Sequence, residues 1–159
     1  MRISFGLVAS LCALSVAACA PTFDPSKSQP SAAKIVDAIR TDEVHWNADW
    51  KSGDVNRILA HYAGDAVVMA PGVPRMEGTQ AIKSGLGEVL QDGSHSLTFA
   101  SDKIEVAKSR DLAVSCGTFT ETKQTITVKG NFVIVYRLGA DGAWKAVWDI
   151  NTPGQAVGK

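Results

Sequence analysis

The feature that most constrains this chain is a change in hydrophobic period near Ser96. Before that point, one apolar stripe has the spacing of a helix, through Ile35, Ile39, Trp46 and Trp50. After it, apolar and polar residues alternate, as at Leu97, Phe99, Ile104 and Val106. A chain that is helical first and β-rich afterwards segregates its helices from its strands, which is typical of an α+β fold.

Glycine, proline and turn-forming pairs separate the predicted elements. We expect helices over 34–51, 55–62 and 80–90, with a short strand over 65–70 between the second and the third. Strands should follow over 96–106, 112–122, 124–138 and 143–151, and Pro153-Gly154 should end the last of them. The strand over 124–138 is apolar on both faces and should be central. These elements predict a curved antiparallel sheet wrapped on three N-terminal helices.

The N-terminus carries the pattern of an export signal. Met1-Arg2 precedes an apolar run to Val16 that is too short to span a bilayer. The following residues, LSVAAC, resemble a bacterial lipobox, so we expect a signal peptide over 1–18 and a lipid on Cys19. Ala20 favours sorting to the outer membrane, facing the periplasm. Ordinary secretion to the periplasm is the alternative, because Ala18-Cys19-Ala20 also fits a simple cleavage site.

A polar segment separates this leader from the folded part. Residues 21–33 hold three prolines and three serines, with Phe23 as the one large apolar residue. Such a composition buries too little surface to offset the entropy of ordering. We therefore predict a flexible tether over 19–33, a single domain over 34–153 and a short tail over 154–159. The lipid on Cys19 should be the only contact with the membrane.

Charge and cysteine content exclude several functions. Lys and Arg total 16, as do Asp and Glu, and no basic cluster is present, so we expect no nucleic-acid partner. Cys116 is the only cysteine beyond Cys19, which excludes a disulfide within the folded part, and we expect it to be buried. Neither His45 nor His61, read as surface residues, has a partner at metal-ligand spacing. We therefore expect no metal and no cofactor.

Several short segments carry a family resemblance. They are Trp50-x-x-Gly53-Asp54, Tyr62-Ala63-x-Asp65-Ala66-Val67, Ala70-Pro71-Gly72, Gly78-x-x-Ala81-Ile82, Asp111-Leu112-Ala113-Val114 and Asp141-Gly142-x-Trp144-Lys145, followed by Asp149-Ile150-Asn151. In this order they resemble the nuclear-transport-factor-two-like superfamily, in its SnoaL-like and ketosteroid-isomerase-like branch. The resemblance implies a cystatin-like cone, an apolar pocket inside it, and usually a homodimer.

The same resemblance argues against steroid isomerisation. Ala70 stands where ketosteroid isomerase has its carboxylate base, Ile134 where it has a second acid, and Trp46 where it has a tyrosine. Enolate chemistry needs a base for the proton and donors for the oxyanion. Trp148 and Ile150 also fill last-strand positions that carry histidines in related cyclases and dehydratases.

Three functions remain open at this stage. The first is binding of a small apolar or aromatic molecule without catalysis, in a pocket lined by Trp46, Trp50, Tyr62, Phe132, Ile134 and Trp148. The second is an enzyme that uses Tyr62 or Asp65 with water, which a buried carboxyl of raised pKa would favour. The third is an assembly module that forms a homodimer through outward residues such as Val133, Val135 and Val147. Asp149 and Asn151 are predicted to face away from the pocket.

Overall fold

The structure, a computed structural model, describes residues 30–91 and 93–158. Its elements are α1 (Ala32–Ser52), α2 (Val55–Leu59), β1 (Tyr62–Met69), β2 (Met76–Glu77), α3 (Gly78–Leu90), β3 (His95–Val106), β4 (Leu112–Lys123), β5 (Ile126–Leu138) and β6 (Trp144–Gly158). The predicted signal peptide, Cys19 and most of the predicted tether lie outside the described residues. Helix α1 begins at Ala32, inside the segment that we expected to be tether.

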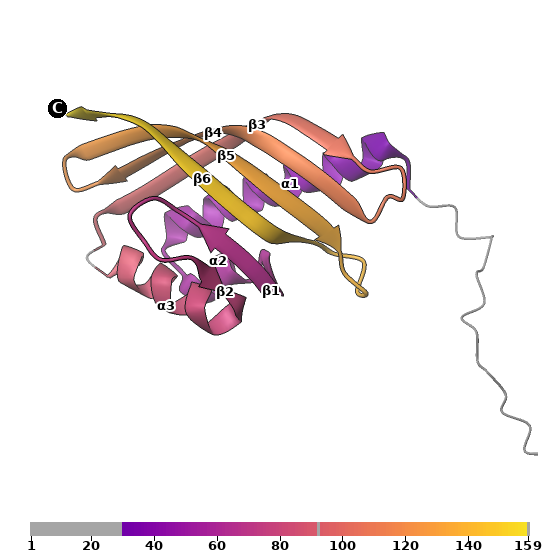
Figure 1. The fold of residues 1–159 in the computed structure, drawn as a ribbon, viewed down its shortest axis with the longest axis horizontal. Helices are drawn as coiled ribbons and strands as arrows, with labels where there is room; N and C mark the ends of the chain where they lie inside the picture. Colours follow the sequence, from indigo (N-terminus) through magenta and orange to yellow (C-terminus); the bar gives the residue numbers. More distant parts are fainter. Residues whose placement is uncertain (1–29, 92, 159) are drawn as a thin grey trace, which may run out of the picture.

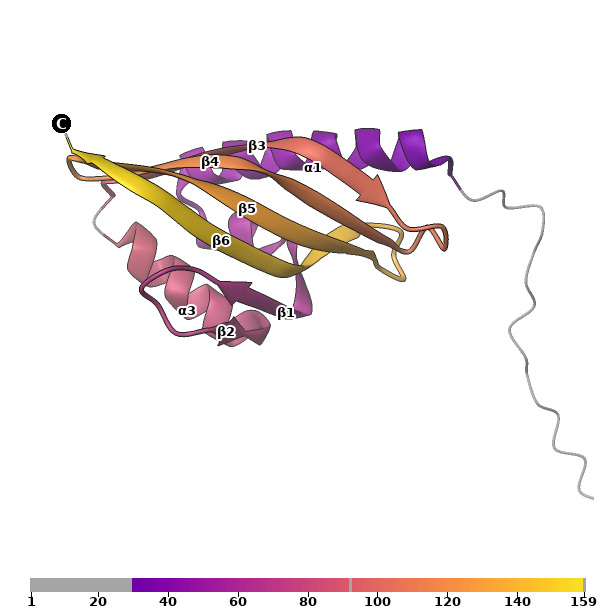
Figure 2. The same cartoon turned by 45° about the horizontal axis from the view of Figure 1, so that its top comes forward.

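The strands form one six-stranded sheet in the order β2-β1-β6-β5-β4-β3. Neighbouring strands are antiparallel except β1 and β6, which run parallel. Figures 1 and 2 show a curved, open sheet with the helices gathered on one side of it. The predicted α+β fold is therefore confirmed, with β5 inside the sheet as expected. The sequence interpretation missed β2 and the place of β1 beside β6.

The last strand is longer than predicted. Strand β6 pairs with β5 as far as Gly158, so the expected end at Pro153-Gly154 is wrong. Its pairing with β1 stops at Ile150, which leaves Pro153 on a stretch bonded to β5 alone. A proline lacks a backbone donor and is tolerated where one side of a strand is unpaired.

The ends of the first two helices follow the predicted capping signals. Gly53, at a φ of 68°, ends α1 and donates its N–H to the carbonyl of Trp50. Asp54 then caps α2 by accepting from the N–H groups of Asn56 and Arg57. Helix α2 ends at Leu59 rather than at Tyr62, because Tyr62 already pairs with β6.

Helix α1 covers the edge of β3 that has no neighbouring strand. The Asn47 amide donates to the carbonyl of Phe99 at 3.0 Å and accepts from the Phe99 N–H at 2.9 Å. Arg40 donates to the carbonyl of Ser101 at 3.1 Å. These side chains take the place of a further strand, which protects an edge that could otherwise pair with another chain. They also fix α1 across the concave face of the sheet, where the core lies.

Candidate functional site

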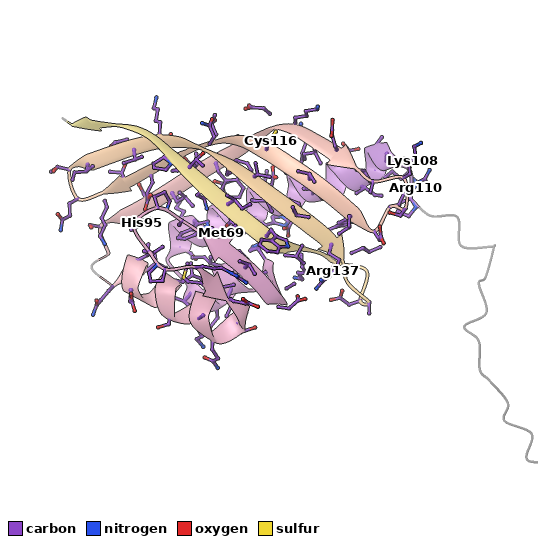
Figure 3. The ribbon with its side chains drawn as sticks, in the orientation of Figure 1. Met69, His95, Lys108, Arg110, Cys116 and Arg137 are labelled. Carbon is purple, nitrogen blue, oxygen red and sulfur yellow. The ribbon has the colours of Figure 1, made fainter. Side chains whose placement is uncertain are left out.

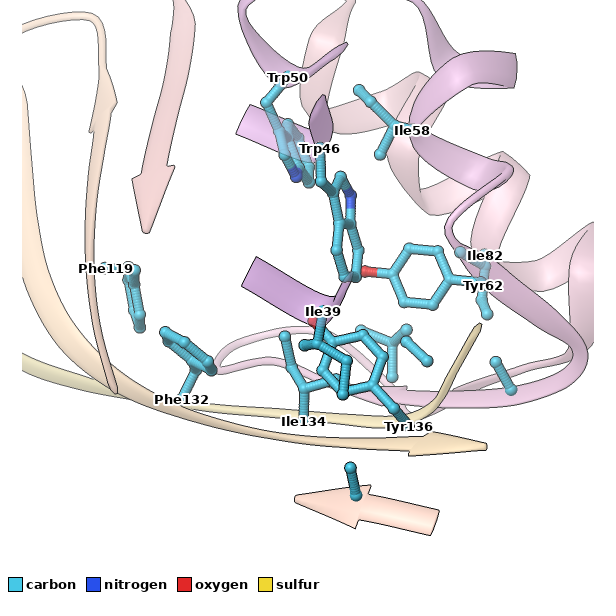
Figure 4. Close-up of a cluster of buried hydrophobic side chains, with 14 of the residues drawn as sticks. Ile39, Trp46, Trp50, Ile58, Tyr62, Ile82, Phe119, Phe132, Ile134 and Tyr136 are labelled. Carbon is cyan, nitrogen blue, oxygen red and sulfur yellow. The ribbon is translucent and has the colours of Figure 1, made fainter. Parts of the chain in front are cut away.

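The interior of the cone is filled by its own aromatic side chains (Figure 4). The ring of Trp46 lies 4.9 Å from that of Tyr62 and 5.5 Å from that of Phe99, and Phe99 lies 5.5 Å from Phe132. Five of the residues predicted to line a pocket belong to this one buried cluster, namely Trp46, Trp50, Tyr62, Phe132 and Ile134. The structure brings them together as expected, but they pack against one another.

The orientation predicted for the last strand is reversed. Trp148 is 42% exposed on the outer face of the sheet, whereas Asp149 is buried on the inner face. The cause is a β-bulge, because Tyr136 pairs with Ala146 and Val135 pairs with Trp148, leaving Val147 as an extra residue. One extra residue shifts the alternation of every side chain that follows it.

A buried acid therefore lies where the sequence predicted an indole ring. The Tyr62 hydroxyl donates to Asp149 Oδ2 at 2.7 Å, and the Asn151 amide donates to Asp149 Oδ1 at 2.9 Å. Burial raises the pKa of Asp149, and the two hydrogen bonds only partly oppose that rise. Burial and the neighbouring carboxylate likewise raise the pKa of Tyr62. The pair offers a proton acceptor and a donor deep in the fold.

A second polar cluster surrounds His61, which we had predicted on the surface. Its ring is buried and stacks on Trp46 at a centroid distance of 5.0 Å. Nδ1 lies 3.1 Å from both carboxylate oxygens of Asp42, and Nε2 lies 3.0 Å from Asp49 Oδ2. Burial lowers the pKa of His61, but the hydrogen bonds to the two aspartates outweigh it and hold that pKa above its usual value. Arg57 contacts Asp49 Oδ1 at 2.8 Å.

A third cluster places a buried glutamate among hydroxyl groups. Glu43 Oε1 accepts from Ser115 Oγ at 3.0 Å and from the Tyr136 hydroxyl at 3.3 Å, and Ser101 also donates to it. Burial raises the pKa of Tyr136, and the neighbouring Glu43 adds to that rise. The spacing of α1 could have revealed Glu43, because it lies on the stripe between Ile39 and Trp46. The cluster ties α1 to three strands.

The outer face of the sheet carries an exposed apolar surface. Leu112, Val114, Val133 and Trp148 are each about 40% exposed there. Together with their neighbours Val67, Val135 and Val147, we call these residues the apolar half of the outer face. A groove of about 540 Å³ runs across it. Ion pairs flank the groove, between Arg137 and Asp65 at 2.6 Å and between Arg75 and Glu77. Figure 3 shows Arg137 at the end of β5. Val133 and Val135 thus face outward as predicted.

The remaining sequence expectations concern cysteine, metals and membrane spans. Cys116 is half-buried on the outer face rather than buried in the core (Figure 3). Within residues 30–91 and 93–158, no group of three or more His, Cys, Asp or Glu side chains is arranged to hold a metal ion. None of the helices in those residues has the length and apolar character to cross a membrane.

Solved structures with similar folds support this architecture. A ketosteroid isomerase-like protein from Erwinia carotovora atroseptica shares 18% identity and superposes with a TM-score of 0.64 over 75% of this chain and 95% of its own. An NTF-2 like protein of unknown function from Shewanella oneidensis shares 17% identity, with a TM-score of 0.65 over 74% and 98%. A domain of unknown function with a cystatin-like fold from Nostoc punctiforme shares 18%, with a TM-score of 0.67 over 79% and 80%.

At these identities the likeness concerns the fold alone. No curated protein matches the chain. The sequence profile of the SnoaL-like domain, in contrast, matches residues 44–147, which is well over half of the chain. The matched region runs from the middle of α1 into β6 and covers most of the sheet, whereas Asp42, Glu43 and Asp149 of the polar clusters lie just outside it. This chain therefore belongs to the SnoaL-like domain family.

Proposed function

We propose that this protein is a homodimeric assembly module of the bacterial cell envelope, joined through the apolar half of its outer sheet face. The observation that carries the proposal is the contrast between the two faces. The inner face is closed by ring-to-ring contacts, whereas the outer face exposes Trp148 and Val133 to about 40%. Contiguous apolar patches of this kind on a monomer mark interaction sites.

A second copy of the chain is the partner that fits best. A two-fold dimer brings the same patch from each subunit together, so an apolar centre meets an apolar centre. The charged groups stand at the border, where the Arg137 and Asp65 side chains are 47% and 66% exposed. This arrangement of apolar core and polar rim is that of a protein interface, which typically buries about 800 Å² per partner.

Sedimentation of the chain from residue 20 onward tests this proposal. We expect a dimer at micromolar concentration, and Val133→Lys should convert it to a monomer because a charge would be buried at the centre of the interface. Thr98→Lys is the matched control, since Thr98 is exposed at the far end of β3. A wild-type chain that stays monomeric at about 100 μM would exclude a dimer of useful strength.

A second function is favoured by the buried Tyr62–Asp149 pair. A carboxyl of raised pKa beside a phenol is the kind of group that transfers protons in enzymes. Catalysis, like the binding of an apolar ligand expected from the sequence, requires the ring cluster around Trp46 to open. Mass spectrometry of small molecules extracted from the purified protein tests both uses. A molecule retained at one per chain, and lost in Ile134→Trp, would support an interior site.

We also propose that the domain is held at the outer membrane by a lipid on Cys19, facing the periplasm. The proposal rests on the lipobox-like residues 14–19 and on Ala20. Fatty-acid labelling of cells expressing the full chain should mark the protein, and Cys19→Ala should abolish the label. Retention of the label in Cys19→Ala would contradict the assignment. A wild-type protein that carries no label and is found free in the periplasm would instead support ordinary secretion.

A further inference from the structure

The outer face of the sheet is divided along its strands into two chemically different halves. Beyond the apolar half, strand pairing places Thr118 opposite Asn131 and Asn131 opposite Thr152. The next row places Thr98 opposite Thr120 and Thr120 opposite Lys129. We call these six residues the polar half. Cross-strand neighbours on one face are about 5 Å apart, so the rows present hydroxyl, amide and ammonium groups at regular intervals.

A groove of about 380 Å³ crosses this polar half. Its polar lining comes from Thr118 and Thr120 on β4 and from Lys129 and Asn131 on β5. Gly154 on β6 completes it, and a Cβ added there would lie 2.5 Å from the carbonyl oxygen of Lys129. The position therefore excludes a side chain, which keeps this side of the groove open. The groove falls within the range of small-molecule sites, about 300–1,000 Å³.

The side chains that line this groove are not engaged by the protein itself. Among residues 30–91 and 93–154, the side chains of Thr118, Thr120, Lys129 and Asn131 make no hydrogen bond or ion pair. One row further along, the hydroxyls of Thr122 and Thr127 do bond to each other, at 3.0 Å. The threonine hydroxyls beside the groove are thus hydrogen-bonded to each other, whereas those that line the groove are free to bind a ligand.

We propose that the polar half binds an acidic oligosaccharide. Sugar hydroxyl groups both donate and accept hydrogen bonds. The free threonine hydroxyls can do the same, and the side-chain amide of Asn131 has both a donating NH2 group and an accepting carbonyl oxygen. Among the described residues that line the groove, Lys129 is the charged one, and its ammonium would pair with a carboxylate. The inference goes beyond the proposed dimer, because it uses the half of the outer face that the apolar contact leaves free.

Titration of the full chain in detergent with an oligomer of galacturonic acid tests the proposal. The matched neutral probe is the galactose oligomer of equal length. We expect the acidic oligomer to bind about three- to tenfold more tightly, the range for one exposed charge-assisted contact. Lys129→Gln should remove that preference, whereas Asn131→Ala should weaken both probes. Thr122→Val, outside the groove, should leave both affinities unchanged, and melting curves verify that each variant is folded.

Several outcomes would overturn the assignment. Absence of binding up to about 10 mM of the acidic oligomer would mean that the threonines serve strand formation alone. Binding that survives both Lys129→Gln and Asn131→Ala would place the site elsewhere. The monomeric variant Val133→Lys should still bind, so the two proposals fail separately, and loss of binding in it would contradict a site contained within one subunit.

Discussion

Raising the pH through the neutral range should destabilise this fold, and His61 should account for the loss. Both ring nitrogens of this buried side chain lie within 3.1 Å of aspartate oxygens. Only the imidazolium form donates from both nitrogens. The hydrogen bonds to Asp42 and Asp49 outweigh burial, so the pKa of His61 in the folded chain is raised.

The sign and size of the effect follow from proton binding. Below a pH of about 6.5 the histidine is charged in both the folded and the unfolded chain, and the stabilisation is fully present. Above that pH the unfolded chain releases a proton that the folded chain keeps. The free energy of unfolding then falls by up to about 1.4 kcal/mol per pH unit until the raised pKa is passed. Arg57 and Lys145 also lie beside this cluster, where they contact Asp49 and the Ala60 carbonyl.

Urea unfolding from about pH 5.5 to about pH 9 measures this slope. His61→Gln should flatten it and should lower the stability at about pH 6 by roughly 3 kcal/mol, because it removes the buried cation that bridges Asp42 and Asp49 and leaves Asp49 with Arg57 alone. His45→Gln is the matched control, since His45 is exposed on α1, the helix that carries Asp42 and Asp49. A slope that is equal in wild type and His61→Gln would refute the reasoning.

Three further changes probe the other contacts. Tyr62→Phe should lower the free energy of unfolding by about 1–3 kcal/mol in urea titrations, because Asp149 loses its hydroxyl donor. An unchanged value would mean that water replaces the hydroxyl. Asn47→Ala should speed hydrogen exchange at the Phe99 amide, whose only bond to α1 it removes, and equal exchange rates would contradict the edge-covering role. Gly130→Ala should lower the melting temperature by several degrees, because its Cβ would lie 2.5 Å from the nearest atoms, and a neutral result would show that the sheet relaxes there.

The change of hydrophobic period was sufficient to predict the fold class. Helical spacing over α1 and alternation from β3 onward are local patterns, and local patterns persist in the folded chain. Capping residues such as Asp54 were equally readable, because the cap acts on its own helix. The parallel pairing of β1 with β6 joins residues about 80 positions apart, and nothing local marks it.

The candidate site was predicted less well because one extra residue in β6 changes which of its side chains face the interior. Up to Ala146 the alternation of β6 follows the sequence, but the bulged Val147 reverses it for Trp148 and Asp149. A bulge depends on how two strands meet, so the spacing within one strand does not reveal it. His61 was predicted on the surface for a related reason. It directly precedes β1, which begins at Tyr62, and this position places its ring against Asp49 of α1.

The buried polar clusters explain why we place function on the outer face. Glu43 ties α1 to β3, β4 and β5, His61 ties α1 to the start of β1, and Asp149 ties β6 to β1. Each cluster buries an ionisable side chain with hydrogen-bond partners on another element, so opening the interior would break those hydrogen bonds. The outer face bears no such penalty, because Leu112, Val114, Val133 and Trp148 are already exposed there. Contacts made there by a second copy or by a saccharide therefore leave the closed interior undisturbed.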